Sequence, residues 1–514
     1  MKRRDLLKAS ITAPYLARFP RARGAGTSFD PDFATAGRAL EAMKAGVISS
    51  RELAELIFTR IRRFNPQINA FMTLREDEAL AEARKADEVR VQRKLMGRLH
   101  GLPVSVKDAF ATAGIRSTAG SKSLENFIPT DDAMAVAKLR QSGAVIVGKT
   151  NLPEFSQDIQ SFNELAGTTN NPWDITRTCG GSTGGGAAAI ASDFSYLELG
   201  SDSAGSIRIP AHFCGVFGHK STVHLVSRVG WMPPLPGEFR GPNDWSVAGP
   251  LARSADDLKL MLEVIAGPVP DEAIAYQWSL PAPRARTLKE YRLGFVLDDP
   301  FCPLAPETAR VHASFLDQLR QAGAKLTEGW PASFDPEHNG EVFRFLTSAF
   351  QAANTGEEQR KDLESELHGQ FATYAKETLA AVRSTYEEWE RHCVERLKYR
   401  RVWQEYFRRF DAFLSPTAIL PAFPHDHSQP RYRRMLDSGA GRRPYNDMFP
   451  WITAAGLSGC PATVVPIGRT GRGLPVGLQV IGPFLEDGTP IHLASLISEL
   501  TGGFEVPPAV KDKN

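Results

Sequence analysis

Two short apolar runs, separated by a segment with helical spacing, limit the possible folds more than any other feature of this sequence. Residues 102–106 and 144–147 are apolar runs of the kind found in buried strands. Residues 131–142 lie between them, carry apolar side chains at helical spacing and end at Gly143, a residue suited to close a helix. A strand, a helix and a second strand in succession indicate an α/β sheet.

The rest of the chain extends this plan. Ser49 and Glu52 have the spacing of a capping box, which marks the start of a helix. Further helical segments are expected within 29–95, 254–265, 307–323 and 340–412, and further strands at 293–297, 462–467 and 476–481. Because the chain leaves the sheet and later returns to it, we predict one domain over residues 28–514. Its architecture is predicted to be a large mixed twisted β-sheet covered by helices on both faces.

Composition excludes several classes of function. Lys and Arg number 61 and Asp and Glu 59, so there is no basic excess of the kind that nucleic-acid binding needs. The five cysteines are scattered without paired spacing, which argues against a disulfide framework and a zinc site. No metal and no cofactor are expected. No run of eighteen apolar residues is present, so no membrane span is expected.

The N-terminus begins Met1-Lys-Arg-Arg-Asp-Leu-Leu-Lys, and this twin arginine resembles the start of a twin-arginine export signal. Small residues at 23–27 would supply the cleavage site. Pro14 and Pro20 interrupt the apolar segment between them, so a basic disordered tail is the alternative. We expect residues 1–27 to be an export signal and the protein to be periplasmic, with a cytoplasmic location as the alternative.

The densest chemical signal is the glycine-rich segment from Cys179 to Ala187. A phosphate-binding Walker loop is rejected, because Ala187 stands where lysine is required. Gly180-Gly-Ser182-Thr-Gly184 matches the nucleophile elbow of α/β-hydrolases, but the polar residues 171–178 are not the buried strand that such an elbow follows. The remaining interpretation is a sharply bent loop in which side-chain volume must be minimal.

Two further segments carry candidate chemistry. Ser206 follows small residues after Gly200, where consecutive backbone N–H groups can converge on one point, as an oxyanion requires. Lys107 ends one predicted strand, and Lys149 follows another. Taken singly, the first segment is typical of a structural turn, and each lysine is typical of a side chain that reaches solvent.

Together, the three segments resemble the amidase signature family. HGLPVSVKD (100–108), GGSTGGGAAA (180–189) and GSDSAGSIRIPA (200–211) are recognisable as motifs of that family. Their spacing also agrees, because Ser182 follows Lys107 by 75 residues and Ser206 follows Ser182 by 24. The resemblance extends from about residue 30 to 500, with a signature core at about 95–265. It implies the amidase-signature fold.

The resemblance also implies a role for each matching residue. Ser206 is the expected nucleophile, Ser182 the bridging serine, held through an unusual cis peptide bond, and Lys107 the base. Lysine serves as a base only if burial lowers its pKa enough to leave it neutral. The backbone N–H groups of Ser203, Ala204, Gly205 and Ser206 are expected to form the oxyanion hole. The expected supporting residues are Asp202 and Arg208, paired with each other, together with Thr183 and Gly181.

Two positions depart from the family pattern. Ala204 stands where glycine is usual, and its methyl group is expected to narrow the acyl pocket while leaving the N–H donor intact. Cys179 replaces proline or a similar residue, and we interpret it as a small filler rather than a second nucleophile. The substrate pocket is expected to be built from the variable segments 230–245 and 340–450. The aromatic candidates there are Trp231, Phe239, Tyr432 and Tyr445.

The function expected from this resemblance is hydrolysis of a small-molecule carboxylic amide, through an acyl-enzyme on Ser206, to the acid and ammonia or an amine. One alternative is the glutaminase subunit of a tRNA-dependent amidotransferase, although residues 340–450 lack a segment matching the glutamine-binding region of those subunits. An esterase with the same triad, an α/β-hydrolase esterase that attacks with Ser182 and a non-catalytic binding protein stay open as well. A homodimer is left open, and the physiological amide is not specified by the sequence.

Overall fold

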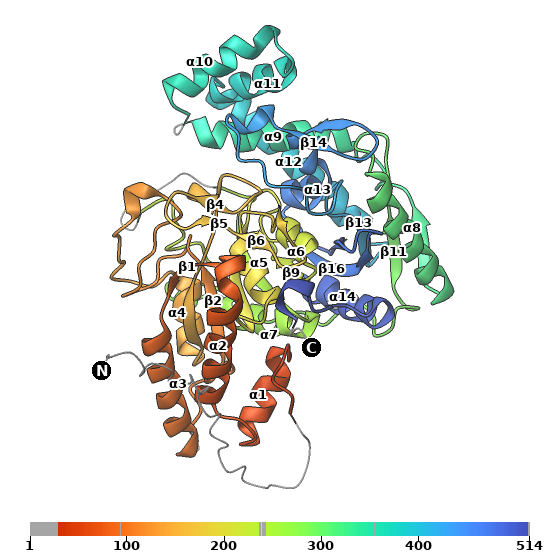
Figure 1. Ribbon diagram of the computed structural model, residues 1–514. Helices are drawn as coiled ribbons and strands as arrows, with labels where there is room; N and C mark the ends of the chain where they lie inside the picture. Colours follow the sequence, from red (N-terminus) through yellow and green to blue (C-terminus); the bar gives the residue numbers. More distant parts are fainter. Residues whose placement is uncertain (1–28, 93, 236–237, 239–242, 353–354, 512–514) are drawn as a thin grey trace, which may run out of the picture.

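A large mixed sheet organises the computed structural model, which describes residues 29–92, 94–235, 238, 243–352 and 355–511 (Figure 1). Within these residues eleven strands hydrogen-bond in the order β1-β3-β2-β8-β10-β9-β16-β17-β13-β11-β12. Parallel pairs join β3, β2 and β8, and also β13, β11 and β12, whereas the pairs between β8 and β13 are antiparallel. The predicted α/β class and mixed sheet are therefore confirmed.

The strands of this sheet are β1 (Phe71–Leu74), β2 (Pro103–Lys107), β3 (Val145–Thr150), β8 (Leu197–Asp202), β9 (Phe217–Lys220), β10 (Val247–Ala252), β11 (Arg292–Phe295), β12 (Lys325–Glu328), β13 (Ala412–Pro416), β16 (Ala462–Arg469) and β17 (Pro475–Ile481). Small two-stranded sheets are formed by β4 (Phe162–Asn163) with β5 (Gly167–Thr168), β6 (Asn170–Asn171) with β7 (Asp174–Thr178), and β14 (Met435–Asp437) with β15 (Arg442–Pro444).

The α-helices are α1 (Ala36–Lys44), α2 (Ser50–Ile68), α3 (Glu76–Val91), α4 (Met134–Gln141), α5 (Gly184–Ala191), α6 (Arg208–Cys214), α7 (Ala255–Ile265), α8 (Pro306–Gln321), α9 (Pro336–Gln351), α10 (Glu357–Ser365), α11 (Ala372–Val382), α12 (Tyr386–Tyr406), α13 (Pro450–Ser458) and α14 (Gly488–Thr501). Single 3-10 turns connect several of these elements.

The N-terminal region differs from its prediction in one respect. The capping box of Ser49 and Glu52 is confirmed at the start of α2. Residues 29–95 are not helical throughout, however, because β1 lies between α2 and α3 and pairs antiparallel with β3 at the edge of the sheet. A four-residue strand between two helices is too short for its side-chain alternation to be recognised.

The centre of the sheet is covered on both faces. Every position of β2, β8, β10, β13 and β17 is buried, although successive side chains point to opposite faces. Helix α5 packs against β2, β3, β8 and β10, and α7 packs against β8, β9 and β10. A polar side chain on one of these strands is therefore removed from water.

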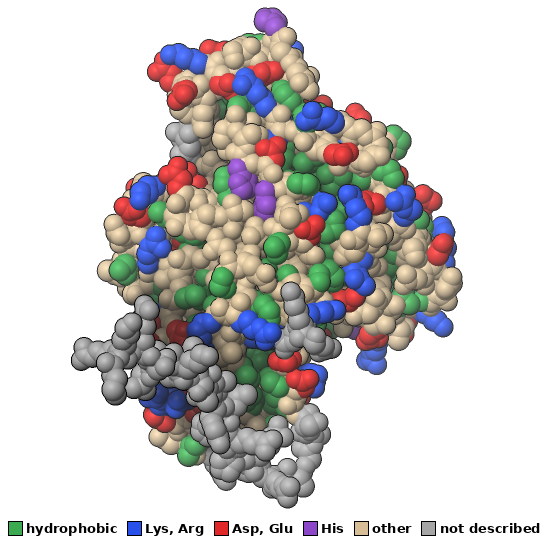
Figure 2. Space-filling view, viewed as in Figure 1, with side chains coloured by type: hydrophobic (Ala, Val, Ile, Leu, Met, Phe, Trp, Pro, Cys, Tyr) green, Lys and Arg blue, Asp and Glu red, His purple; other side chains and the backbone are tan. Residues whose placement is uncertain are grey.

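A group of helices stands above one end of the sheet. In Figure 1, α10 and α11 project at the top, and α9, α12 and α13 lie between them and the strands. Helix α9 contacts α11, α12 and α13, around a second hydrophobic cluster that includes Trp403 and Trp451. On the face in Figure 2, acidic and basic side chains are interspersed rather than gathered by sign.

Two of the sequence predictions concern membranes and export. Among the helices of the described residues, none combines the length and the apolar composition needed to cross a bilayer. The predicted export signal at residues 1–27 lies outside the described residues.

Candidate active site

Lys107 is the last residue of β2 and its side chain is completely buried. Strand β2 lies between β3 and β8, and Lys107 pairs with Thr150 of β3. Its Nζ donates hydrogen bonds to Ser182 Oγ at 2.6 Å and to Ser201 Oγ at 2.9 Å. The lysine therefore does not reach solvent, and it contacts the serine that the resemblance placed beside it.

Burial changes the proton affinity of this amine. Removal from water lowers the pKa of Lys107 to about 7, against the opposing charges of Glu198 and Asp202, which raise it. Much of the Lys107 population is therefore neutral at physiological pH. Lys149, the other lysine noted in the sequence, is also buried, but it lies 3.4 Å from Asp108 Oδ1 and donates to Phe110 O.

The glycine-rich loop holds Ser182 against this lysine. The Gly181–Ser182 peptide bond is cis, as the resemblance implied. A Cβ atom on Gly181 would lie 2.7 Å from the backbone of residues 158–160, so only glycine fits there. Thr183 Oγ1 donates to Ser201 O and fastens the loop to β8. The segment before the loop ends in β7, which pairs with β6 outside the main sheet, so the setting of a nucleophile elbow is absent.

Ser206 lies just before α6 and is 8% exposed at the floor of a cavity. Its carbonyl oxygen accepts a hydrogen bond of 3.0 Å from the N–H of Thr183, which follows Ser182. Within the described part of the chain, the Ser206 hydroxyl makes no hydrogen bond, so its contact with Ser182 is not formed in this state. Hydrogen bonds of this kind commonly tighten only when substrate is bound.

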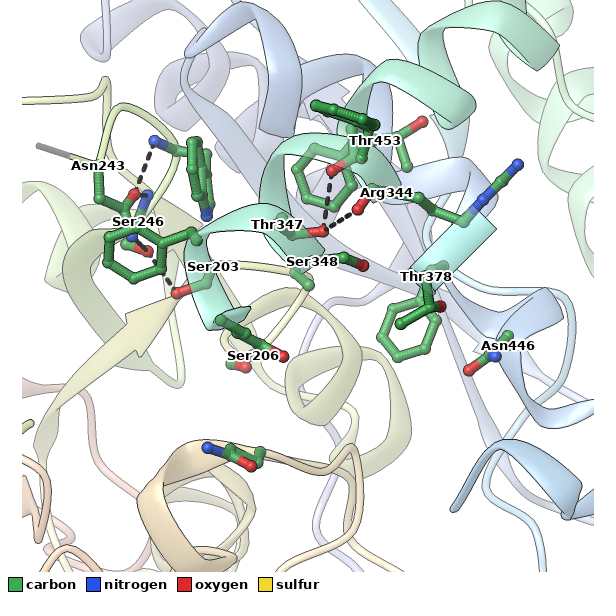
Figure 3. Close-up of a pocket in the computed structure, with 18 of the residues that line it drawn as sticks. Ser203, Ser206, Asn243, Ser246, Arg344, Thr347, Ser348, Thr378, Asn446 and Thr453 are labelled. Carbon is green, nitrogen blue, oxygen red and sulfur yellow. Dashed lines mark hydrogen bonds between the residues drawn. The ribbon is translucent and has the colours of Figure 1, made fainter. Parts of the chain in front are cut away.

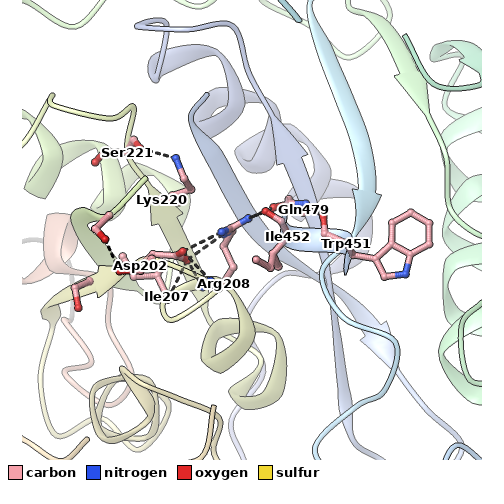
Figure 4. Close-up of polar contacts among 12 residues, drawn as sticks. Asp202, Ile207, Arg208, Lys220, Ser221, Trp451, Ile452 and Gln479 are labelled. Atoms are coloured by element: carbon pink, nitrogen blue, oxygen red, sulfur yellow. Dashed lines mark hydrogen bonds and ion pairs between the residues drawn. The ribbon is translucent and has the colours of Figure 1, made fainter. Parts of the chain in front are cut away.

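Asp202 and Arg208 form the buried pair that was predicted (Figure 4). Arg208 donates through Nε and Nη2 to the two carboxylate oxygens at 3.0 and 2.9 Å, and through Nη1 to Ile452 O and Gln479 Oε1. Burial alone would raise the pKa of Asp202, but Arg208 holds it at about 2. The pair fastens the loop that carries Ser206 to β17 and α13.

The same carboxylate requires a correction to the predicted oxyanion hole. The N–H of Gly205 donates to Asp202 Oδ1 at 2.9 Å, so it is already bonded and does not face a substrate. Among the described residues, the N–H groups of Ser203, Ala204 and Ser206 have no hydrogen-bond acceptor. Three of the four predicted donors therefore remain available in this geometry.

The cavity above Ser206 has a volume of about 470 Å³ (Figure 3). One wall is formed by the loop of Ser203 and Ala204, and the facing wall by residues of α9 and α11, such as Thr347 and Thr378. Several aromatic side chains line it, including Trp231, Trp245, Phe343, Phe345 and Phe350. The cavity thus takes residues from both segments in which the pocket was predicted.

Two of the predicted pocket aromatics do not line this cavity. Tyr445 is buried and donates to Asp158 Oδ1 at 2.5 Å, and Tyr432 packs with Leu363 and Leu379. Phe239 lies outside the described residues. Sequence composition identified an aromatic-rich segment but not which rings turn inward.

A polar chain near Ser206 was not predicted from the sequence. Asn243 Oδ1 accepts from the N–H groups of Trp245 and Ser246, so its Nδ2 is the group that donates to Ser246 Oγ at 2.8 Å. Ser246 Oγ in turn lies 2.7 Å from Ser203 Oγ (Figure 3). Ser201 was missed as well, although it directly precedes Asp202 in the motif.

Cys179 has the filler role that was predicted. It is fully buried, and burial raises the pKa of its thiol to about 12, so the thiolate needed for nucleophilic attack is negligible at neutral pH.

The described residues contain no group of three or more His, Cys, Asp or Glu side chains arranged to hold a metal ion.

Comparisons with known proteins show which family and fold the chain has. The family model described as Amidase matches residues 52–490. A glutamyl-tRNA(Gln) amidotransferase subunit of Thermus thermophilus is 34% identical over 483 residues, which cover 89% of this chain and 95% of that protein. The crystal structure of the corresponding subunit from Thermotoga maritima superimposes with a TM-score of 0.74, at 27% identity, and covers 94% of this chain and 99% of that one. Native peptide amidase from Stenotrophomonas maltophilia gives a TM-score of 0.72, at 27% identity, with 92% and 98% covered.

The buried Asp202–Arg208 pair gives a stability prediction. Arg208→Met keeps the side-chain length but removes the cation that is hydrogen-bonded to the Asp202 carboxylate, and we expect a loss of about 3–5 kcal/mol in the free energy of unfolding. Urea titration followed by fluorescence measures it. The matched control is Arg320→Ala, which breaks an ion pair with Asp317 whose side chains are 57% and 65% exposed and should cost less than about 1 kcal/mol. Equal stability of both variants would contradict the role given to the buried pair.

Proposed function

The chain belongs to the amidase family, and we propose that it hydrolyses a linear carboxylic amide through an acyl-enzyme on Ser206. The observation that carries the proposal is the 2.6 Å hydrogen bond between buried Lys107 and Ser182, whose chain neighbour Thr183 donates through its N–H to the carbonyl oxygen of Ser206 in the wall of the cavity. A serine hydroxyl is a weak nucleophile until a base takes its proton, and Lys107 is the basic side chain that hydrogen-bonds to Ser182.

The proposed reaction begins with neutral Lys107. Its Nζ takes the proton of Ser182, Ser182 takes that of Ser206, and Ser206 Oγ forms a bond to the amide carbonyl carbon. The carbonyl oxygen becomes an oxyanion, for which the N–H groups of Ser203, Ala204 and Ser206 are the proposed donors, each contributing roughly 3 kcal/mol. The proton then returns through Ser182 to the leaving nitrogen, the C–N bond breaks, and water releases the acid from Ser206.

The cavity supports a preference for amides that carry an aromatic or extended apolar group. Its aromatic lining buries such a group well, and the Asn243–Ser246–Ser203 chain supplies polar contacts next to the reacting carbonyl. We propose that aryl or aralkyl amides have a higher kcat/KM than acetamide. Esterase activity with the same triad is included in this proposal, because an ester presents the same carbonyl to Ser206.

A second candidate function is that of the corresponding tRNA-dependent amidotransferase subunit. Its support is the relatives of that name, which are 29–34% identical to this chain over about nine tenths of its length. It predicts ammonia release from glutamine and copurification of partner proteins. We also propose that residues 1–27 are an export signal, on the basis of the twin arginine at Arg3 and Arg4. Export would argue against the amidotransferase function, because a periplasmic protein cannot serve translation. Fractionation of cells that express the full chain tests the export.

The triad proposal predicts the effect of three substitutions. Ser206→Ala is expected to abolish amide hydrolysis, whereas Ser182→Ala and Lys107→Met are expected to lower kcat by about 10²–10⁴-fold, because the hydroxyl is no longer deprotonated. A fluorophosphonate probe should label Ser206 by mass spectrometry. Wild-type turnover in Lys107→Met, or labelling at Ser182 instead, would overturn the assignment. Circular dichroism spectra establish that each variant is folded.

The low pKa of Lys107 predicts the pH dependence. Only the neutral amine accepts a proton, so kcat/KM should rise with pH and reach half its plateau near the Lys107 pKa of about 7. Below that pH the ammonium form predominates and activity is lost. Lys107→Arg, whose guanidinium keeps its proton, serves as the control and should be inactive throughout. A wild-type profile that is flat or falls with pH across this range contradicts the proposal.

The proposed substrate preference predicts how kcat/KM differs between aromatic amides and acetamide. Anilides and benzamide should give kcat/KM at least about tenfold above acetamide, because the aromatic lining stabilises the bound ring. Trp245→Ala should reduce this ratio without lowering the acetamide rate by a comparable factor. A ratio near one in the wild type, or glutamine as the best substrate in the same screen, would favour the amidotransferase candidate.

A further inference from the structure

Glu198 is a buried carboxyl group that the proposed mechanism does not use. It is the second residue of β8, is 0% exposed, and pairs with Ser105 of β2, two residues before Lys107. Its side chain points toward α5, where a Cβ on Gly186 would lie 2.4 Å from Glu198 Oε1. The helix therefore has a glycine where the carboxyl group needs room.

The hydrogen bonding of this carboxyl group is incomplete. Thr150, which pairs with Lys107 across the sheet, donates through Oγ1 to Glu198 Oε1 at 2.6 Å. Within the described residues, Glu198 Oε2 has no hydrogen-bond partner, although it is inaccessible to solvent. A buried carboxylate whose oxygen accepts no hydrogen bond destabilises the folded protein unless a nearby positive charge compensates for it.

The charges of two lysines, Lys107 and Lys149, lower the pKa of Glu198, and within the described residues Lys149 has a carboxylate partner of its own. Lys149 of β3 already lies against Asp108, and Asp202 of β8 is paired with Arg208. The facing helix α5 (GGGAAAIA) and the next strand β10 (VAGPLA) contribute no ionisable side chain. Of the charged side chains on these elements, Lys107 and Glu198 remain. They stand on adjacent strands, and Thr150, which donates to Glu198, is the neighbour of Lys107 on β3.

From this arrangement we propose that Glu198 is a positioning residue whose carboxylate stabilises the ammonium form of Lys107 and so increases its strength as a base. The inference rests on the proposed function of Lys107. The proton moves from Ser182 Oγ to Lys107 Nζ and later to the leaving nitrogen, whereas Glu198 exchanges no proton with the substrate and supplies charge alone.

The proton affinities of the two groups agree with such a pairing. Burial raises the pKa of Glu198 to about 7, although the hydroxyls of Ser105 and Thr150 lower it. The charge of Lys107 lowers the pKa of Glu198 as well. Burial lowers the pKa of Lys107 to about 7, and Glu198 is the largest of the charges that oppose that change. The two groups therefore ionise over the same pH range, and removing one charge alters the titration of the other.

The test is Glu198→Gln, which keeps shape and removes charge. The readout is the rate at which a fluorophosphonate probe labels Ser206 as a function of pH, because this reports activation of the nucleophile without a known substrate. We expect the midpoint to move to lower pH by about one unit and the plateau rate to fall roughly three- to tenfold, because Lys107 becomes a weaker base. An unchanged or higher midpoint overturns the proposal.

Two further variants complete the experiment. Asp257→Asn removes another buried carboxyl group, one that accepts from the N–H groups of Ala36 and Gly37, and it should leave the midpoint unchanged. Glu198→Met removes the charge without requiring any hydrogen bond, and should give the same shift as Glu198→Gln. If neither Glu198 variant folds, the carboxyl group is needed by the sheet itself and the proposal is wrong.

The outcomes separate this inference from the proposed function. If the probe fails to label Ser206 in the wild type, the proposed nucleophile is wrong. If the wild type is labelled with a midpoint near 7 and Glu198→Gln behaves identically, the triad stands and only the role of Glu198 is rejected.

Discussion

The hydrogen bond from a buried lysine to the hydroxyl of Ser182 depends on the sheet in which the lysine lies. Lys107 stays out of water because β3 and β8 flank its strand and helices cover both faces. That burial lowers the pKa of the amine, as its proposed role as a base requires, and the same sheet supplies Ser201, Thr150 and Glu198 as its polar surroundings. The same buried residues therefore stabilise the fold and determine the protonation of the lysine in the site.

The loops that carry Ser182 and Ser206 are fastened by different means. The loop of Ser182 is determined by close packing, because Gly181 touches the backbone of residues 158–160 and has no room for a side chain. The loop of Ser206 is held electrostatically, by the Asp202 carboxylate, which accepts from backbone N–H groups and from Arg208. One carboxylate thereby orders the loop, occupies the Gly205 N–H and leaves its neighbours free.

The sequence alone predicted the helices and strands whose side-chain pattern is local. The strands at β2 and β3, the helix between them and the capping box of α2 follow from side-chain spacing, whereas the prediction that Lys107, Ser182 and Ser206 share one site came from the family resemblance of three motifs. Strand β8 was not predicted, because Gly200 and Ser201 are typical of a loop and only the sheet makes them extended. Glu198 was overlooked for a related reason: a lone charge in an apolar run is informative only once its neighbours are known. The orientation of Tyr445 depends on a contact with Asp158, 287 residues away.

The two walls of the cavity come from different parts of the chain. Lys107 stands on β2, Ser182 in the loop before α5 and Ser206 in the loop after β8, whereas much of the opposite wall of the cavity is supplied by the helices α9 and α11. Substitutions in those helices can alter which molecules fit while the proton relay is left untouched. A protein divided in this way can gain new substrates through single substitutions, each of which leaves the enzyme active. The helices α9 and α11 are therefore the region to randomise in directed evolution.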